Sequence, residues 1–187
     1  MKDHDPLTLT TELRAKTAQV HEALDSNLKH AFGQVDQYVA FLRASYRVLS
    51  SLNDKLSNLC QVSTAERSAQ VAADLQALGH EAPSAPPEAW TPSEVAEAMG
   101  CAYVVEGSRL GGLVLAKVVE RELGLTATSY LRGTGPQTKD LWRSFISELD
   151  AWGERAQPEE RQSAVSGAIA TFTAYMRCFK DEGLLRA

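Results

Sequence analysis

His21 and Asp25 are the residues of this sequence whose types and spacing are best suited to holding a metal. They lie four residues apart, so a helix places them one turn from each other on the same face. A neutral imidazole binds iron, including haem iron, through one ring nitrogen, and a carboxylate on the other nitrogen fixes its tautomer. Arg14 lies two turns before His21, where it can reach an anionic group. The alternative is a hydrogen-bonded core histidine beside a solvated arginine.

Three glycines form the second unusual feature. Gly107, Gly111 and Gly112 lie inside a segment of helical periodicity, although each interior glycine costs a helix about 1 kcal/mol relative to alanine. One explanation is close helix–helix packing, because bare backbone lets a neighbouring helix approach. The other is a flat ligand that lies against the backbone, where a Cβ would clash. The sequence alone leaves both explanations open.

Helical periodicity extends along nearly the whole chain, and no alternating run of Val, Ile or Thr predicts a strand. An apolar stripe from Leu13 to Leu28 marks the first helix, with Thr10 or Thr11 as its N-cap. The fourth helix is predicted to open at Thr91-Pro92 and to continue through the three glycines. The predicted helices span about 12–28, 38–56, 65–78, 92–124, 139–154 and 158–181.

Three segments are predicted to lie outside helices. Residues 1–8 are expected to be flexible, residues 80–90 form a proline-rich surface loop, and residues 130–137 form a glycine-containing loop. The part of the chain after the proline-rich loop is too short to build a second core. The sequence therefore predicts a single all-α domain of six to eight helices over residues 1–187.

Charge and cysteine content exclude several classes of protein. A net charge of −5 and a pI of about 5.4 argue against nucleic acid as a partner, because that binding requires basic surface. No stretch approaches the roughly 18 consecutive apolar residues of a membrane span, and the N-terminus has no secretion signal. Cys60, Cys101 and Cys178 are far apart, which is typical of reduced thiols. We therefore expect a cytoplasmic protein that binds neither membrane nor nucleic acid.

Four segments carry a resemblance to a known family: LRAKTAQVHEALD (13–25), YVVEGSRLGGLVLAK (103–117), KDLWRSF (139–145) and FTAYMRCF (172–179). In this order they resemble the proximal helix, the distal helix, a basic helix near the propionates and the final helix of bacterial, biliverdin-producing haem oxygenases. The resemblance covers about residues 9–180. It implies the haem oxygenase-like helical fold, with haem between a proximal helix and a kinked distal helix.

The resemblance also implies a role for individual residues. His21 would ligate the iron, and Gly107, Ser108, Gly111 and Gly112 would form the catalytic distal wall. Arg14, Lys139 and Arg143 would meet the propionates. The residues implied to contact haem or its ligand are Arg14, Thr17, Asp25, Tyr103, Lys139, Arg143 and Phe172.

Two positions depart from the mammalian members of the family. There, the residue after the first distal glycine is an aspartate that holds water beside bound oxygen, whereas this chain has Ser108. A hydroxyl can organise water, but it is a weaker acceptor without charge. A mammalian tyrosine that contacts a propionate falls on Ala102, with Tyr103 beside it. The replacement by Ser108 bears on oxygen activation and on which meso carbon is attacked.

The activity implied by the resemblance is the oxidative cleavage of haem to biliverdin, CO and ferrous iron. Haem is both substrate and cofactor, O2 is consumed, and electrons come from an external donor such as a ferredoxin or a flavoprotein reductase. The sequence leaves open whether the useful product is iron or a bilin passed to a photoreceptor. It also leaves the biliverdin isomer open.

Three alternatives compete with this interpretation. A non-enzymatic haem carrier or sensor would use the same pocket, and Ser108 is the residue that favours it. Di-iron oxidases and thiamin-degrading hydrolases share the helical architecture, but the chain has no Glu-x-x-His motif and no cysteine in a reactive setting. An all-α interaction domain without a ligand is the plainest alternative.

Overall fold

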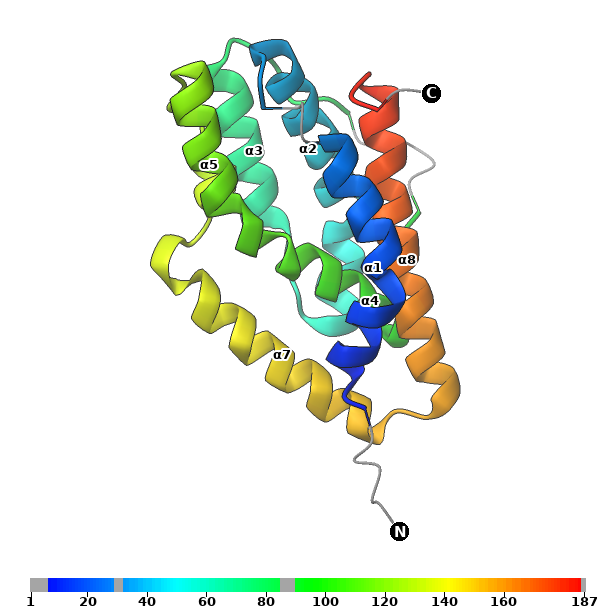
Figure 1. Ribbon diagram of the computed structural model, residues 1–187. Helices are drawn as coiled ribbons and strands as arrows, with labels where there is room; N and C mark the ends of the chain where they lie inside the picture. The colour runs from blue at the N-terminus through cyan, green and yellow to red at the C-terminus, as the bar shows by residue number, and fades with distance from the viewer. Residues whose placement is uncertain (1–6, 29–31, 85–89, 186–187) are drawn as a thin grey trace.

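The computed structural model describes residues 7–28, 32–84 and 90–185. In these ranges the chain forms eight α-helices and one 3-10 helix, and no strand (Figure 1). The all-α prediction is therefore confirmed. The helices are α1 (Leu9–Leu28), α2 (Val35–Cys60), α3 (Ala65–Ala77), α4 (Val95–Gly107), α5 (Arg109–Leu123), α6 (Ser129–Arg132), η1 (Gly135–Gln137), α7 (Thr138–Arg155) and α8 (Pro158–Asp181).

The closest contact between helices joins α4 and α8. Gly100 of α4 faces the backbone of Ala164 in α8, and Gly167 of α8 faces the backbone of Glu97 in α4. A Cβ at either glycine would overlap a carbonyl of the other helix. The two helices therefore touch backbone to backbone, and α1 and α2 pack against α8 around this contact.

The predicted starts of two helices were wrong. Helix α1 begins at Leu9, because the Thr8 Oγ1 accepts a hydrogen bond from the Thr11 N–H at 3.3 Å. Helix α4 begins at Val95, three residues after Pro92. A side-chain carboxylate of Glu97 accepts the backbone N–H of Ser93 at 2.8 Å, so the donors before the first turn are satisfied there.

The single long helix predicted over 92–124 is two helices. Helix α4 ends at Gly107 and α5 begins at Arg109, with Ser108 between them. The Ser108 hydroxyl donates to the Val105 carbonyl at 2.7 Å, and a side chain that binds backbone in this way competes with the helical hydrogen bonds. The predicted kink is therefore a break, and it lies at the residue after the first distal glycine.

The segment predicted as a loop over 130–137 contains the last three residues of α6 and all of η1. Positive φ at Gly133 (+46°) and Gly135 (+59°) separates these short elements, which explains why the sequence favours a loop. Of the proline-rich segment, residues 80–84 and 90 lie outside helices, and 85–89 lie outside the described residues. Residues 1–6 also lie outside the described residues, so the expected flexibility of 1–8 stays a prediction.

The three cysteines are unpaired thiols on separate helices. Burial raises the pKa of the thiols of Cys60 and Cys178, and it raises the pKa of Cys101 to about 12. None of the described helices combines the length and apolar character needed to cross a bilayer.

Candidate active site

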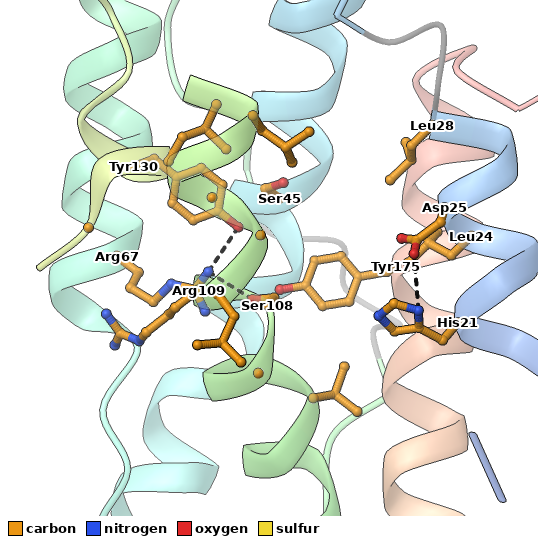
Figure 2. A pocket seen from close by; sticks show the side chains of 18 of the residues that line it. His21, Leu24, Asp25, Leu28, Ser45, Arg67, Ser108, Arg109, Tyr130 and Tyr175 are labelled. Carbon is orange, nitrogen blue, oxygen red and sulfur yellow. Dashed lines mark hydrogen bonds and ion pairs between the residues drawn. The ribbon is translucent and has the colours of Figure 1, made fainter. Parts of the chain in front are cut away.

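A cavity of about 460 Å³ lies between α1 and the junction of α4 with α5 (Figure 2). Side chains of α2, α3, α6, α7 and α8 complete its lining. Its apolar lining includes Leu24, Phe41, Val104, Leu115, Leu131 and Phe179. A cavity of this kind, mostly apolar with a few polar groups, is typical of a site for a large organic ligand.

His21 faces the cavity from α1 with its ring already oriented. The His21 Nδ1 lies 3.1 Å from an Asp25 carboxylate oxygen, and the two side chains are 58% and 62% exposed. The Phe172 ring of α8 meets the imidazole edge to face, with centroids 5.6 Å apart. Because Nδ1 is used by Asp25, the other ring nitrogen, Nε2, is left to bind a metal.

The three distal glycines have different surroundings. All three line the cavity. A Cβ at Gly111 would meet nothing within 4 Å, so this position is open backbone. A Cβ at Gly112 would overlap the Leu131 carbonyl of α6, and one at Gly107 would lie 3.3 Å from the Trp142 ring of α7. The ligand explanation thus suits Gly111, whereas the packing explanation suits Gly112.

A buried arginine forms the polar wall opposite His21. Arg67 of α3 is 2% exposed and lies near the break between α4 and α5. Its guanidinium donates to the Val105 carbonyl at 2.6 Å, the Ser108 hydroxyl at 3.0 Å and the Tyr130 hydroxyl at 3.2 Å. It also lies over the Tyr130 ring, 5.1 Å from the centroid. Figure 2 shows the bonds of Arg67 to Ser108 and Tyr130 on one side of the cavity and the His21–Asp25 pair on the other.

Two further hydroxyls in the cavity are buried without a partner in the described part of the chain. These are Ser45 Oγ on α2 and the Tyr175 hydroxyl on α8. Burial raises the pKa of the Tyr175 hydroxyl well above its ordinary value, so this group stays a neutral donor. Buried polar atoms are nearly always hydrogen-bonded, and orphaned ones mark a place for water or a polar ligand group.

The structure brings together most, but not all, of the predicted site residues. His21, Asp25, Tyr103, Gly107, Ser108, Gly111, Gly112 and Phe172 all line the cavity. Thr17 is not among the described lining residues: it is buried in the core, and its hydroxyl donates to the Leu13 carbonyl at 2.8 Å. Its role is therefore internal to α1.

The three predicted propionate-binding cations also lie outside the described lining. Arg14 is exposed on α1, but it is close enough to Tyr103 for its charge to oppose the rise that burial causes in the pKa of that hydroxyl. Lys139 is exposed on α7. Arg143 is exposed and binds Asp140 at 2.7 Å, so its charge is already partly neutralised.

Sequence reasoning missed Arg67, Tyr130, Trp142 and Tyr175 as cavity residues. A signal for Arg67 was present: it lies four residues before Val71 and eight before Leu75, on the buried stripe of α3. A cation on an apolar stripe is rarely tolerated without a partner. Tyr130 gave no such signal, because the sequence of its segment favours a loop.

Residues 7–181 of the chain match the family model described as Heme oxygenase. The chain belongs to the haem oxygenase family. It is 29% identical to the heme oxygenase of Xanthomonas campestris over 167 residues, which covers 83% of this chain and 98% of the relative. It is also 29% identical over 175 residues to heme oxygenase PigA of Pseudomonas aeruginosa, which covers 87% of each. The structure of the NO- and CO-bound heme oxygenase from Neisseria meningitidis matches with a TM-score of 0.79 and 25% identity, over 97% of this chain and 94% of that chain.

Membership in the haem oxygenase family confirms the predicted family, fold and activity. The chain is an oxidoreductase that degrades haem with O2. No comparison favours the non-enzymatic carrier. Within the described residues, no group of three or more His, Cys, Asp or Glu side chains could hold a metal, so the di-iron alternative gains no support.

Proposed function

We propose that haem is bound and cleaved in the cavity between α1 and the α4–α5 junction, with His21 as the iron ligand. One observation carries this proposal. The oriented His21 imidazole faces a cavity whose opposite wall is open backbone at Gly111 and polar at Arg67 and Ser108. An apolar slot with one metal-binding nitrogen and bare backbone opposite fits a flat macrocycle that carries iron.

On the α1 side, two residues prepare His21 for iron. The Asp25 carboxylate holds Nδ1 and so leaves Nε2 with its lone pair. Phe172 limits rotation of the ring through its edge-to-face contact. When bound, haem supplies both the iron that activates O2 and the macrocycle that is opened.

On the opposite side, Arg67 compensates for the missing aspartate. Ser108 has no charge of its own, but its hydroxyl accepts a hydrogen bond from the buried Arg67 guanidinium. Together with the unpartnered hydroxyls of Tyr175 and Ser45, this wall can hold ordered water and pass protons toward the O2 side. None of these groups is a strong acid, which suits a reaction that must attack the macrocycle before the O–O bond is simply reduced.

The propionates are best received at the edge of the cavity formed by Tyr103 and Arg14. Tyr103 lines the cavity, and the Arg14 cation lies beside it. Lys139 and Arg143 are exposed on α7, from where they can contribute long-range attraction and a weaker contact. We expect this cluster to fix the rotation of haem and therefore the biliverdin isomer.

We further propose that an external ferredoxin or flavoprotein reductase supplies the electrons, as the resemblance to haem oxygenases implies. The three unpaired thiols are typical of a reducing compartment, which favours the cytoplasm. A photoreceptor that accepts biliverdin is a candidate partner for the product.

The test is a single-turnover assay of the purified protein loaded with hemin. Addition of ascorbate or a reductase in air should remove the Soret band, while biliverdin absorbance grows and CO is released. Saturable hemin binding at a 1:1 ratio without these products would indicate that the protein is a haem carrier and not an enzyme. A hemin titration without a saturable Soret change would overturn the site itself.

A further inference from the structure

Helix α3 carries the two fully buried charges of the described chain. Arg67 is 2% exposed and Asp74 is 3% exposed. They lie seven residues apart, two turns along one face of α3. Neither forms an ion pair with another described residue. Asp74 is compensated by hydrogen bonds, and Arg67 by hydrogen bonds and by the face of the Tyr130 ring. Burying a charge in this way is unfavourable, which points to a function beyond stability.

Asp74 uses both carboxylate oxygens on α6. Its Oδ1 accepts the Ser129 backbone N–H at 2.9 Å and the Ser129 hydroxyl at 2.6 Å. Its Oδ2 accepts the Tyr130 backbone N–H at 2.9 Å. A helix of four residues is too short to be stable by its own hydrogen bonds. The Asp74 carboxylate therefore fixes the start of α6 and the position of the Tyr130 backbone.

Tyr130 is thus held at both ends by α3. Asp74 holds its backbone, and Arg67 holds its hydroxyl at 3.2 Å and covers its ring. The same Arg67 nitrogen that binds Tyr130 also binds Ser108 on the polar wall. A shift of Tyr130 would therefore release one of the contacts that aim the guanidinium at Ser108.

We infer that Asp74, which does not line the cavity, is a positioning residue for the haem oxygenase reaction and acts through Tyr130 on the Arg67–Ser108 wall. The inference rests on the proposed function of that wall. Other hydrogen bonds also hold the segment around α6 in place. Asp74 is therefore not needed merely to attach this segment, which favours a role in positioning Tyr130. Tyr38 donates to the Ala127 carbonyl at 2.8 Å, and Glu120 accepts hydrogen bonds from Thr128 and Arg132.

The variant Asp74→Asn tests this role, because an amide keeps one acceptor for Ser129 but presents a donor to the Tyr130 N–H. The measured quantities are the hemin Kd, the absorption spectrum of the ferric haem complex, and the biliverdin formed per electron consumed. We expect a Kd within about twofold of the wild type and a yield per electron lower by about fivefold, which is what one net hydrogen bond is worth. The electrons not used for biliverdin should appear as hydrogen peroxide, and the ferric spectrum should shift.

Two comparisons distinguish a positioning role of Asp74, exerted through Tyr130, from a purely stabilising role. Tyr130→Phe removes the hydroxyl that Arg67 holds, and the double variant with Asp74→Asn should be no worse than Tyr130→Phe alone. Glu120→Gln is the matched control: it makes the same carboxylate-to-amide change against the same segment, but it touches the side chains of Thr128 and Arg132. It should leave the yield per electron and the ferric spectrum as in the wild type.

A lower melting temperature of Asp74→Asn with an unchanged yield and spectrum would overturn the inference, as would additive effects in the double variant. If Asp74→Asn does not fold, Asp74→Ser keeps a single capping oxygen and is measured in the same way. Failure of both variants to fold would reduce Asp74 to a stability residue and overturn its positioning role. Absence of biliverdin from the wild type would instead overturn the proposed function, so the two failures are distinguishable.

Discussion

The α4–α8 interface and the cavity beside the α4–α5 junction both depend on glycine, but for opposite reasons. At the interface, the space beside Gly100 and Gly167 is already occupied by the backbone of the opposing helix. At the cavity, Gly111 has nothing within 4 Å of its missing Cβ. Contacts that are complete in the protein itself serve stability. Open backbone that also lines a cavity, as at Gly111, leaves room for a ligand to approach.

The largest effect is expected at the cavity, for the substitution His21→Ala. The substitution removes the nitrogen that faces the cavity, so turnover of haem to biliverdin should fall to background. The apo melting temperature should change by no more than about 2 °C, because exposed substitutions are usually worth within about 0.5 kcal/mol. Thermal unfolding of the apo protein and the single-turnover assay measure the two quantities. Turnover at the wild-type rate without added imidazole would show that another residue ligates the iron.

The next largest effect is expected at the α4–α8 interface. Gly100→Ala or Gly167→Ala places a methyl group against backbone that cannot move aside, and overpacking of this kind costs about 1–3 kcal/mol or more. The apo melting temperature should fall by roughly 5–10 °C. Material that still folds should bind hemin with nearly the wild-type Kd. A stable Gly100→Ala protein would mean that α4 and α8 can separate at little cost.

Two adjacent glycines give the sharpest form of the comparison. Gly111→Ala should raise the apo stability, by up to about 1 kcal/mol, because alanine is the better helix former and the position is open. Its haem turnover should nevertheless fall, since the methyl group enters the space assigned to the ligand. Gly112→Ala should lower the apo stability by about 1–3 kcal/mol, because it meets the Leu131 carbonyl. Equal shifts of the two melting temperatures in the same direction would contradict this division.

The smallest effects are expected for the cations on α7. Lys139→Ala and Arg143→Ala should each weaken hemin binding by less than about fivefold, because exposed ion pairs are worth about 0–1 kcal/mol. Arg14→Ala should have the larger effect on the biliverdin isomer mixture, since Arg14 lies beside Tyr103 and Arg143 is already paired with Asp140. Chromatography of the isomers measures this ranking. An isomer mixture unchanged in all three variants would remove these residues from the propionate site.

Much of the fold could be predicted because local signals agree with the tertiary structure. Helix α8 begins at Pro158 and ends at Asp181 as predicted, since Pro158 occupies the first turn and the Gln157–Glu160 capping box supports it. The break at Ser108 could not be predicted, because it depends on a hydroxyl that binds its own helix and on a partner 41 residues earlier. Helix α6 was missed for a similar reason: its first turn is held by Asp74, not by its own sequence.

The candidate site divides in the same way. His21 and Asp25 could be paired from their spacing, because one helical turn brings them together. Gly111 and Gly112 could not be told apart, since only the position of Leu131 distinguishes them. Arg67 could be recognised from the sequence as a charged residue on an apolar stripe. Its hydrogen bond to Ser108 could not be predicted, because it depends on how three helices are arranged.

The state of the cysteines has a consequence for the durability of the protein. Haem degradation brings O2, iron and reductant together, and peroxide that escapes oxidises thiolates far faster than thiols. Burial raises the pKa of all three cysteines, with Cys101, on the same helix as Gly107, reaching about 12. At neutral pH the sulfur atoms are therefore protonated and slow to react. We therefore expect escaped peroxide to oxidise these three sulfur atoms more slowly than it would an exposed thiolate.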